Sequence, residues 1–223
     1  MLAFLGRQRI AILYVVFGGG GLWHFLGVLN KTMDVLSGYM ISVLSVYLIY
    51  EYSRIIPVES RRKYYFWLVL VFMGSFLLEA VGVYTGWPFG DYSYGLILQP
   101  QLFMVPLSIG FAWILILLSS LSLTLAVFGE IRLLRTSPLA LFLAAATFML
   151  FFDILMEPAA IYLDYWVWHS ETIPFTNYLT WFLAGFAFYL VYWFLKLPYR
   201  ITPAVGVHVY LAQVLYFTLV LLR

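Results

Sequence analysis

The centre of the chain, residues 103–128, reads FMVPLSIGFAWILILLSSLSLTLAVF and contains no charged side chain. A helix that crosses the hydrocarbon core of a bilayer needs about 20 predominantly apolar residues. Because unsatisfied backbone groups are costly in lipid, a run of this kind crosses the bilayer as an α-helix. The stretch therefore predicts a transmembrane helix in the middle of the chain.

Comparable apolar runs lie on both sides of this stretch. Pro57, Pro138, Pro198 and Pro203 stand near their ends, where proline is tolerated. No Ser/Gly-rich linker divides the chain, so residues 1–223 are predicted to form one transmembrane domain. The predicted fold is all-α, a polytopic integral membrane protein of seven helices, with the six further helices at about 10–29, 35–56, 64–84, 138–163, 176–197 and 203–222.

The composition excludes several other classes of protein. Hydrophobic residues make up 65% of the chain and charged residues only 10%, which is too apolar for a soluble domain. The net charge of +2 gives no reason to expect nucleic acid as a partner. Without cysteine there is no disulfide framework and no thiolate ligand. The histidines His24, His169 and His208 lack metal-ligand spacing, so no metal is expected.

Lysine and arginine predict the orientation, because cytoplasmic loops are enriched in them. With the N-terminus in the cytoplasm, only Lys31 and Arg223 fall on the outer side. The chain is accordingly expected in the inner (cytoplasmic) membrane as a multi-pass protein. The predicted inner side holds Arg7, Arg9, Arg54, Arg61, Arg62, Lys63, Arg132, Arg135, Lys196 and Arg200.

Two loops on the predicted outer side, at 85–95 and 164–178, are aromatic, contain proline and lack lysine and arginine. They are typical of packed caps or re-entrant segments rather than flexible linkers. Glu79 precedes Tyr84 by five residues, and Glu157 precedes Tyr162 by the same spacing. This echo leaves open both a parallel duplication and chance.

Three carboxyl groups stand out within the apolar runs, where ionisable residues are costly and suggest function. Asp153 and Glu157 are four apart and share a helical face, and Glu79 belongs to another run. Apolar surroundings and a neighbouring carboxylate favour one protonated and one ionised group, as acid–base chemistry requires. The alternative is that polar partners satisfy these groups, which would then only fix helix packing.

Further side chains near the two loops are candidates for the same site. Asp91 is a candidate catalytic group or a turn-forming residue. His24 is a candidate for completing the site, or a histidine bonded to a backbone carbonyl. The aromatic candidates could stabilise a carbocation with their π faces or act as interfacial anchors; they are Trp87, Tyr92, Tyr94, Trp113, Tyr162, Trp166, Trp168 and Trp181.

These residues together resemble the signature of a known family, the bacterial and archaeal carotenoid biosynthesis proteins known as carotenoid 1,2-hydratases. One departure is Ser170-Glu171-Thr172, where many members are expected to have Gly and Tyr. The matching motifs are Glu79-x-x-Gly82-x-x-Thr85-Gly86-Trp87-Pro88-Phe89-Gly90-Asp91-Tyr92-x-Tyr94, Val105-Pro106 with Trp113, Asp153-x-x-x-Glu157-Pro158, Trp166-x-Trp168, and Ile173-Pro174 with Asn177-Tyr178 and Trp181.

The resemblance implies hydration of the terminal C1–C2 double bond of an acyclic ψ end group, as in lycopene or γ-carotene. It implies a cofactor-independent hydro-lyase that gives a 1-hydroxy carotenoid. Glu79, Asp153 and Glu157 would share the proton-donor and base roles, with Asp91 and His24 in support. Asn177 would join the aromatic residues in binding a substrate that stays in the bilayer, and association with other enzymes of the pathway is expected.

Two other functions are left open by the residues. A carotenoid end-group cyclase begins with the same protonation, but an internal alkene then captures the cation in a dry pocket. A membrane transporter or proton relay would pass protons or ions from one carboxyl group to the next. This function predicts polar residues through the inner half of the helices as well, but that half is mostly apolar. A non-enzymatic structural role is a third alternative.

Overall fold

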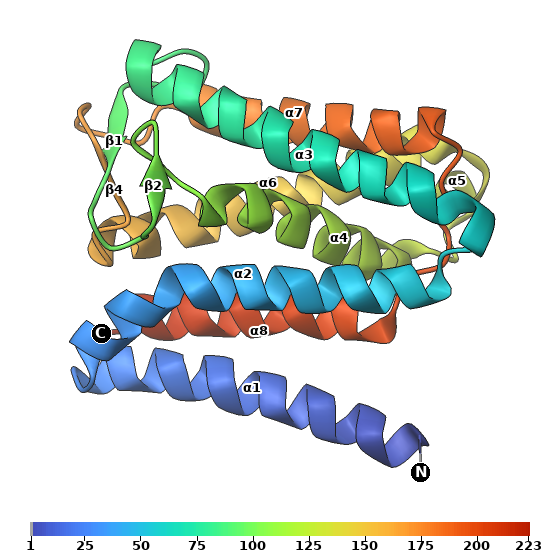
Figure 1. The fold of residues 1–223 in the computed structure, drawn as a ribbon, viewed down its shortest axis with the longest axis horizontal. Helices are drawn as coiled ribbons and strands as arrows, with labels where there is room; N and C mark the ends of the chain where they lie inside the picture. The colour runs from blue at the N-terminus through green and yellow to red at the C-terminus, as the bar shows by residue number, and fades with distance from the viewer. Residues whose placement is uncertain (1) are drawn as a thin grey trace.

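A computed structural model describes residues 2–223, with side chains from residue 8 onward, as a bundle of long helices capped at one end (Figure 1). Two small antiparallel sheets, β1–β4 and β2–β3, accompany the helices. The elements are α1 (Leu2–Leu26), α2 (Asn30–Ile55), α3 (Val58–Thr85), β1 (Tyr92–Tyr94), β2 (Gln101–Leu102), β3 (Val105–Pro106), α4 (Ser108–Phe128), α5 (Arg132–Thr136), α6 (Pro138–Tyr162), β4 (Trp166–Trp168), α7 (Phe175–Phe194) and α8 (Ala204–Leu221).

The predicted all-α membrane fold is confirmed. Within the described residues, six helices are long and apolar enough to cross a bilayer, namely α1, α2, α3, α4, α6 and α8. Helix α7 is of comparable length and carries no charged residue, but it is not one of these six helices. Seven crossings therefore stay a prediction, while the multi-pass architecture is established.

The helix ends follow local chemistry. Pro57 and Pro203 are the residues before α3 and α8, and Pro138 opens α6. Ser137 caps α6 by accepting a hydrogen bond from the Ala140 amide at 3.3 Å. The central helix begins later than predicted, at 108 rather than 103, because residues 101–106 form the β2–β3 pair.

Helix α4 is the most buried of the apolar helices and packs against α2, α3, α6 and α8. Two buried tyrosines from neighbouring helices fix its position. The Tyr52 hydroxyl donates to the Leu118 carbonyl and the Tyr189 hydroxyl to the Leu117 carbonyl, both at 2.7 Å. These bonds satisfy phenols that burial would otherwise leave unpaired.

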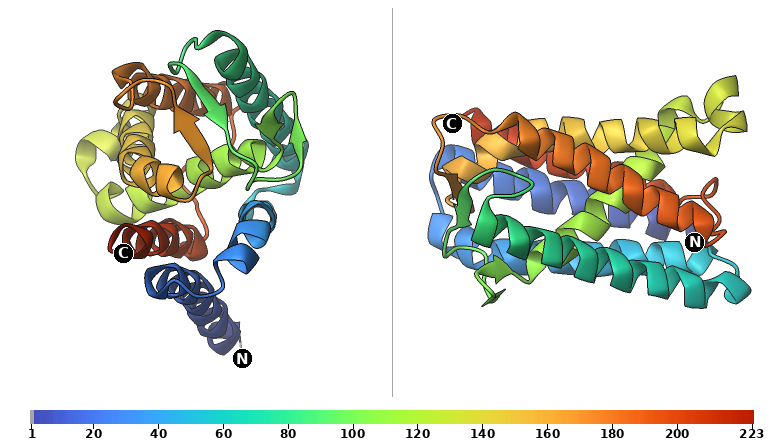
Figure 2. Two further views of the ribbon diagram at one scale, coloured as in Figure 1. Left: turned by 90° about the vertical axis from the view of Figure 1, so that its left-hand side faces the viewer. Right: turned by 90° about the horizontal axis from the view of Figure 1, so that it is seen from above.

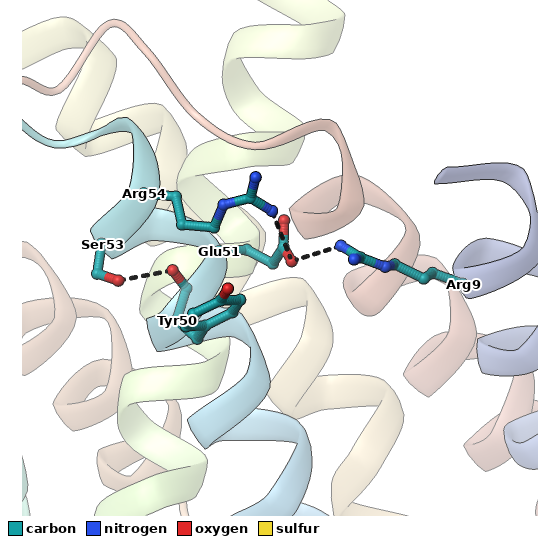
Figure 3. A network of polar contacts seen from close by, with 5 residues as sticks. All are labelled: Arg9, Tyr50, Glu51, Ser53 and Arg54. Atoms are coloured by element: carbon teal, nitrogen blue, oxygen red, sulfur yellow. Dashed lines mark hydrogen bonds and ion pairs between the residues drawn. The ribbon is translucent and has the colours of Figure 1, made fainter. Parts of the chain in front are cut away.

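The end of the bundle that holds the N-terminus, the α2–α3 connection and α5 is rich in basic residues (Figure 1). Glu51 there accepts a hydrogen bond from Arg9 at 3.0 Å and lies 3.9 Å from Arg54 (Figure 3). Glu51 thus forms an ion pair with arginines of α1 and α2 at this end. Which side of the membrane this end faces stays a prediction.

The opposite end is closed by the two aromatic loops, which pair through β1 and β4 and lie across the bundle (Figure 2). Phe89 and Tyr92 are only 2% and 4% exposed. The prediction of a packed cap is confirmed. The cap joins parts of the chain that follow α3 and α6, and it brings their side chains over the ends of both helices.

Candidate active site

Glu79, on α3, is buried and holds three hydrogen bonds. Its Oε2 accepts from the hydroxyls of Tyr92 and Tyr94 at 2.5 and 2.9 Å. Its Oε1 accepts from the indole N–H of Trp113 on α4 at 3.1 Å. Both tyrosines come from β1, where residues two apart point to the same face of the strand. We call this set of four residues the phenol clamp.

Gly82 makes the phenol clamp sterically feasible. It lies one helical turn after Glu79, beneath the strand. A Cβ at this position would meet the Phe89 ring at 2.8 Å and the Tyr92 hydroxyl at 3.0 Å. A side chain here would displace the phenol that reaches Glu79, so the glycine follows from the approach of the cap to the helix.

Glu157, on α6, is buried and is held in a matching way. Its Oε2 accepts from the indole N–H groups of Trp166 and Trp168 at 3.1 and 2.9 Å. Its Oε1 accepts from the side-chain amide of Asn177 on α7 at 3.1 Å. The two tryptophans are alternate residues of β4, as the two tyrosines are of β1. We call these four residues the indole clamp.

The β1–β4 pairing places the two clamps beside each other. Tyr92 is opposite Trp168 and Tyr94 is opposite Trp166, with ring centroids 5.1 and 6.0 Å apart. Burial raises the pKa of both tyrosines above the ordinary value of about 10. The phenols therefore stay protonated near neutral pH and remain hydrogen-bond donors.

Both clamps face one apolar cavity of about 80 Å³ under the cap. Trp113 and Trp181 stack on its wall with centroids 4.3 Å apart. Of the site residues predicted from sequence, the structure gathers nine around this cavity: Glu79, Tyr92, Tyr94, Trp113, Glu157, Trp166, Trp168, Asn177 and Trp181.

Asp153 lies beside the site but not on the cavity wall. Its side chain is fully buried, and its Oδ2 accepts from Asn177 at 3.1 Å. The same amide nitrogen donates to Glu157, so Asn177 bridges the two carboxyl groups. Asp153 Oδ1 is buried without a hydrogen-bond partner. Asp153 lies near Glu157, as the four-residue spacing predicts. Its side chain contacts Asn177 but does not line the cavity.

Asp91 is not brought into the site. It directly precedes β1, and its side chain points outward, where it is 73% exposed. Its Oδ1 lies 3.0 Å from His169 Nδ1, and His169 Nε2 lies 3.1 Å from the Ser93 hydroxyl. None of these three residues lines a cavity found in the described residues. We interpret this serine–histidine–aspartate chain as a surface link between β1 and β4.

Three further candidates also lie away from the cavity. His24 is buried edge-to-face against Tyr216 on α8, with centroids 5.8 Å apart. Trp87 is 69% exposed at the rim of the cap. Tyr162 is exposed near the Arg223 guanidinium, which lies 5.9 Å from its ring centroid. The predicted roles of these three side chains in the site have no geometric support.

The cavity wall also includes residues that the sequence reasoning missed. Tyr165 precedes β4, and Gln213 and Phe217 lie on α8. Gln213 gave a usable signal, because it is the only amide side chain in a mostly apolar helix. Tyr165 and Phe217 gave none, since aromatic residues are abundant throughout this chain.

The fold and the site together define a multi-pass membrane protein with two buried, hydrogen-bonded carboxyl groups on an aromatic cavity. A family model described as "Carotenoid biosynthesis protein" matches residues 35–222. The chain belongs to the carotenoid biosynthesis protein family, as the motifs predicted.

One curated relative is similar to this chain. It is the bisanhydrobacterioruberin hydratase of Haloarcula japonica, with 32% identity over 143 residues. The matched region covers 60% of this chain and 45% of the relative, so the chain spans about half of that protein's length. No solved structure matches the chain significantly.

Proposed function

We propose that this protein is an enzyme that adds water across the terminal C1–C2 double bond of an acyclic carotenoid end group. The observation that carries the proposal is that Glu79 and Glu157, from different helices, face one small apolar cavity. The relative in Haloarcula japonica is named a hydratase, which supports the same reaction class. The substrate would be a carotenoid of the lycopene or γ-carotene type, held within the bilayer.

The reaction requires an acid, a base and a shielded cation. A carboxyl group gives its proton to C2 of the alkene, and a tertiary cation forms at C1. The π faces of the stacked Trp113 and Trp181 are suited to stabilise that charge. Water adds to C1 and loses a proton to a carboxylate, which leaves a tertiary alcohol. Hydration changes no overall oxidation state, so this scheme needs no redox cofactor.

The hydrogen-bond partners favour one assignment of the two roles. Indole and amide N–H groups can only donate, so the indole clamp is suited to an ionised Glu157. A phenol can donate or accept, so the phenol clamp can also accommodate a protonated Glu79. We therefore assign Glu79 as the proton donor and Glu157 as the base that receives the proton of water.

The test is expression in a lycopene-accumulating bacterial host, with analysis of the extracted pigments by chromatography and mass spectrometry. A product heavier by one water with unchanged polyene absorption is expected. General acid–base groups contribute about 100- to 10,000-fold, so Glu79→Gln and Glu157→Gln should each lower product by such a factor. Glu51→Gln, at the other end of the bundle, is the matched control and should be neutral.

Three outcomes would contradict the proposal. Full activity of both amide variants would remove the carboxyl groups from the chemistry. A product of unchanged mass with a shortened chromophore would identify an end-group cyclase instead. If lycopene is returned unaltered by folded protein, γ-carotene is the substrate to test next, and failure with both would contradict the assigned reaction.

A further inference from the structure

A second apolar cavity, of about 160 Å³, lies beside the first at the capped end of the bundle. Its wall comes from three helices: Gly20 and Trp23 of α1, Met33 and Leu36 of α2, and Tyr216 of α8. Its side chains are almost all apolar or aromatic. A cavity of this chemistry suits a hydrocarbon rather than an ion or a sugar.

The two cavities share a partition. Four residues line both of them: Ile41 of α2, Tyr165 just before β4, and Gln213 and Phe217 of α8. These four side chains therefore have the carboxyl-lined cavity on one side and the second cavity on the other. Rearrangement of side chains in this partition would join the cavities into one continuous channel.

The outer wall of the second cavity opens toward the lipid-facing surface. Val16, Trp23 and Leu36 line the cavity and are also 41%, 43% and 43% exposed. Helix α1 packs mainly along α8, where Gly21 allows contact with Leu219, and it touches α2 much less. Toward its N-terminus α1 slopes away from the bundle (Figure 1). The seam between α1 and α2 is thus the weakly packed side of this cavity.

The size of the first cavity makes a second compartment necessary for a long substrate. Pockets that enclose drug-sized ligands measure about 300–1,000 Å³. The carboxyl-lined cavity, at about 80 Å³, has room for a chain end but not for an extended polyene. The remainder of a long substrate must lie elsewhere, and the adjoining apolar cavity leads from the site to the surface.

We propose that the second cavity is a polyene-binding site, through which a long apolar chain passes from the bilayer between α1 and α2 to the carboxyl groups. This rests on the proposed function, because it takes a carotenoid end group as the occupant of the first cavity. The substrate moves from lipid to site without crossing water. Helix α1, which precedes the family-matched residues 35–222, supplies one wall of this path.

Two adjacent glycines give a matched test. A Cβ on Gly20 would lie 2.9 Å from the flexible end of Met33 and 3.5 Å from the Tyr216 ring, so Gly20→Phe places a ring in the second cavity. Gly19 has no atom within 4 Å of an added Cβ, so Gly19→Phe adds the same ring outside it. Both variants, with the wild type, are produced in the lycopene-accumulating host and purified in detergent.

Two quantities are measured: lycopene retained per protein, from its visible absorption, and hydrated product in the cells. Gly20→Phe is expected to lower both at least tenfold, while Gly19→Phe matches the wild type. The proposed binding site would be overturned if the two variants retained equal lycopene and made equal hydrated product, and if size-exclusion chromatography showed both to be folded. Should Gly20→Phe fail to fold, Leu36→Trp narrows the same path from α2 and must show the same loss.

The two readouts separate this proposal from the proposed function. Wild-type protein that retains lycopene but makes no hydrated product, with retention lost in Gly20→Phe, would support the binding site and contradict hydration of this substrate. Hydration that proceeds equally in all variants would support the reaction and overturn the path. Wild-type protein that neither retains nor hydrates lycopene or γ-carotene would count against both.

Discussion

The phenol clamp around Glu79 and the indole clamp around Glu157 share one plan built from different donors. In each, a helix supplies the carboxyl group, a short strand supplies two aromatic donors, and a later helix supplies the third. The strands pair with each other, and the aromatic donors face across the pair. The echo noted between the two halves of the sequence therefore has a counterpart in the structure, although this does not decide between duplication and chance.

The difference between the clamps is the chemistry of the donors. Indole and amide N–H groups donate to a carboxylate but cannot accept a hydrogen bond from a protonated carboxyl group, whereas a phenol hydroxyl can do both. A site with one clamp of each kind distinguishes two otherwise identical glutamates. The comparison suggests how two carboxyl groups on one cavity could take opposite roles.

The largest effect is expected from removing both indole donors. Trp166→Phe combined with Trp168→Phe keeps the aromatic rings but leaves Glu157 with Asn177 alone. Hydrogen bonds to charged groups contribute about 1.5–3 kcal/mol each, so hydration should fall by at least 100-fold. The measurement is the initial rate of product formation in isolated membranes. A double variant that folds and retains its rate would separate the indole clamp from catalysis.

A smaller and more discriminating effect is expected from single changes. Tyr92→Phe and Trp168→Phe each remove one donor, and each should slow hydration by roughly 10- to 100-fold. Tyr92→Phe should have the larger effect, because it also removes an acceptor from the protonated Glu79. The ratio of the two rates in the same membrane assay tests this, and equal rates would mean that phenol and indole are interchangeable here.

Asp153→Asn should have a modest effect. The side chain does not line the cavity and one oxygen has no partner, while the amide keeps the shape and an acceptor for Asn177. We expect a rate within about tenfold of wild type and a stability within about 1 kcal/mol. Denaturation of the purified protein, measured beside the rate, checks both. A loss as large as that of Glu157→Gln would place Asp153 in the chemistry.

The smallest effect is expected at the surface. Asp91→Asn weakens an exposed pair with His169, and exposed ion pairs contribute about 0–1 kcal/mol. Thermal inactivation and hydration should both stay close to wild type. A strong loss of hydration in this variant would show that the outward-facing serine–histidine–aspartate link matters to the reaction, contrary to its placement outside the cavity.

The sequence was sufficient to predict the helices, because each apolar run is long enough that the bilayer leaves few alternatives. It also identified Glu79 and Glu157, since carboxyl groups are rare in such runs. It could not show that Tyr92 points into the site and Asp91 away from it, because these directions depend on the pairing of β1 with distant β4. It also could not show that Asp153 lies behind Glu157, since residues four apart share a face and packing decides which one reaches a cavity.

Each clamp is assembled from one continuous part of the chain: Glu79 finds all its donors by Trp113, and Glu157 finds all of its own by Asn177. All the donors that Glu79 uses are thus synthesised before the second half of the chain, so its carboxyl group draws no hydrogen bond from later residues. The β1–β4 pairing, by contrast, must wait for both halves. We expect the hydrogen bonds to each carboxyl group to form before the cap closes, because an unpaired carboxylate is costly in lipid.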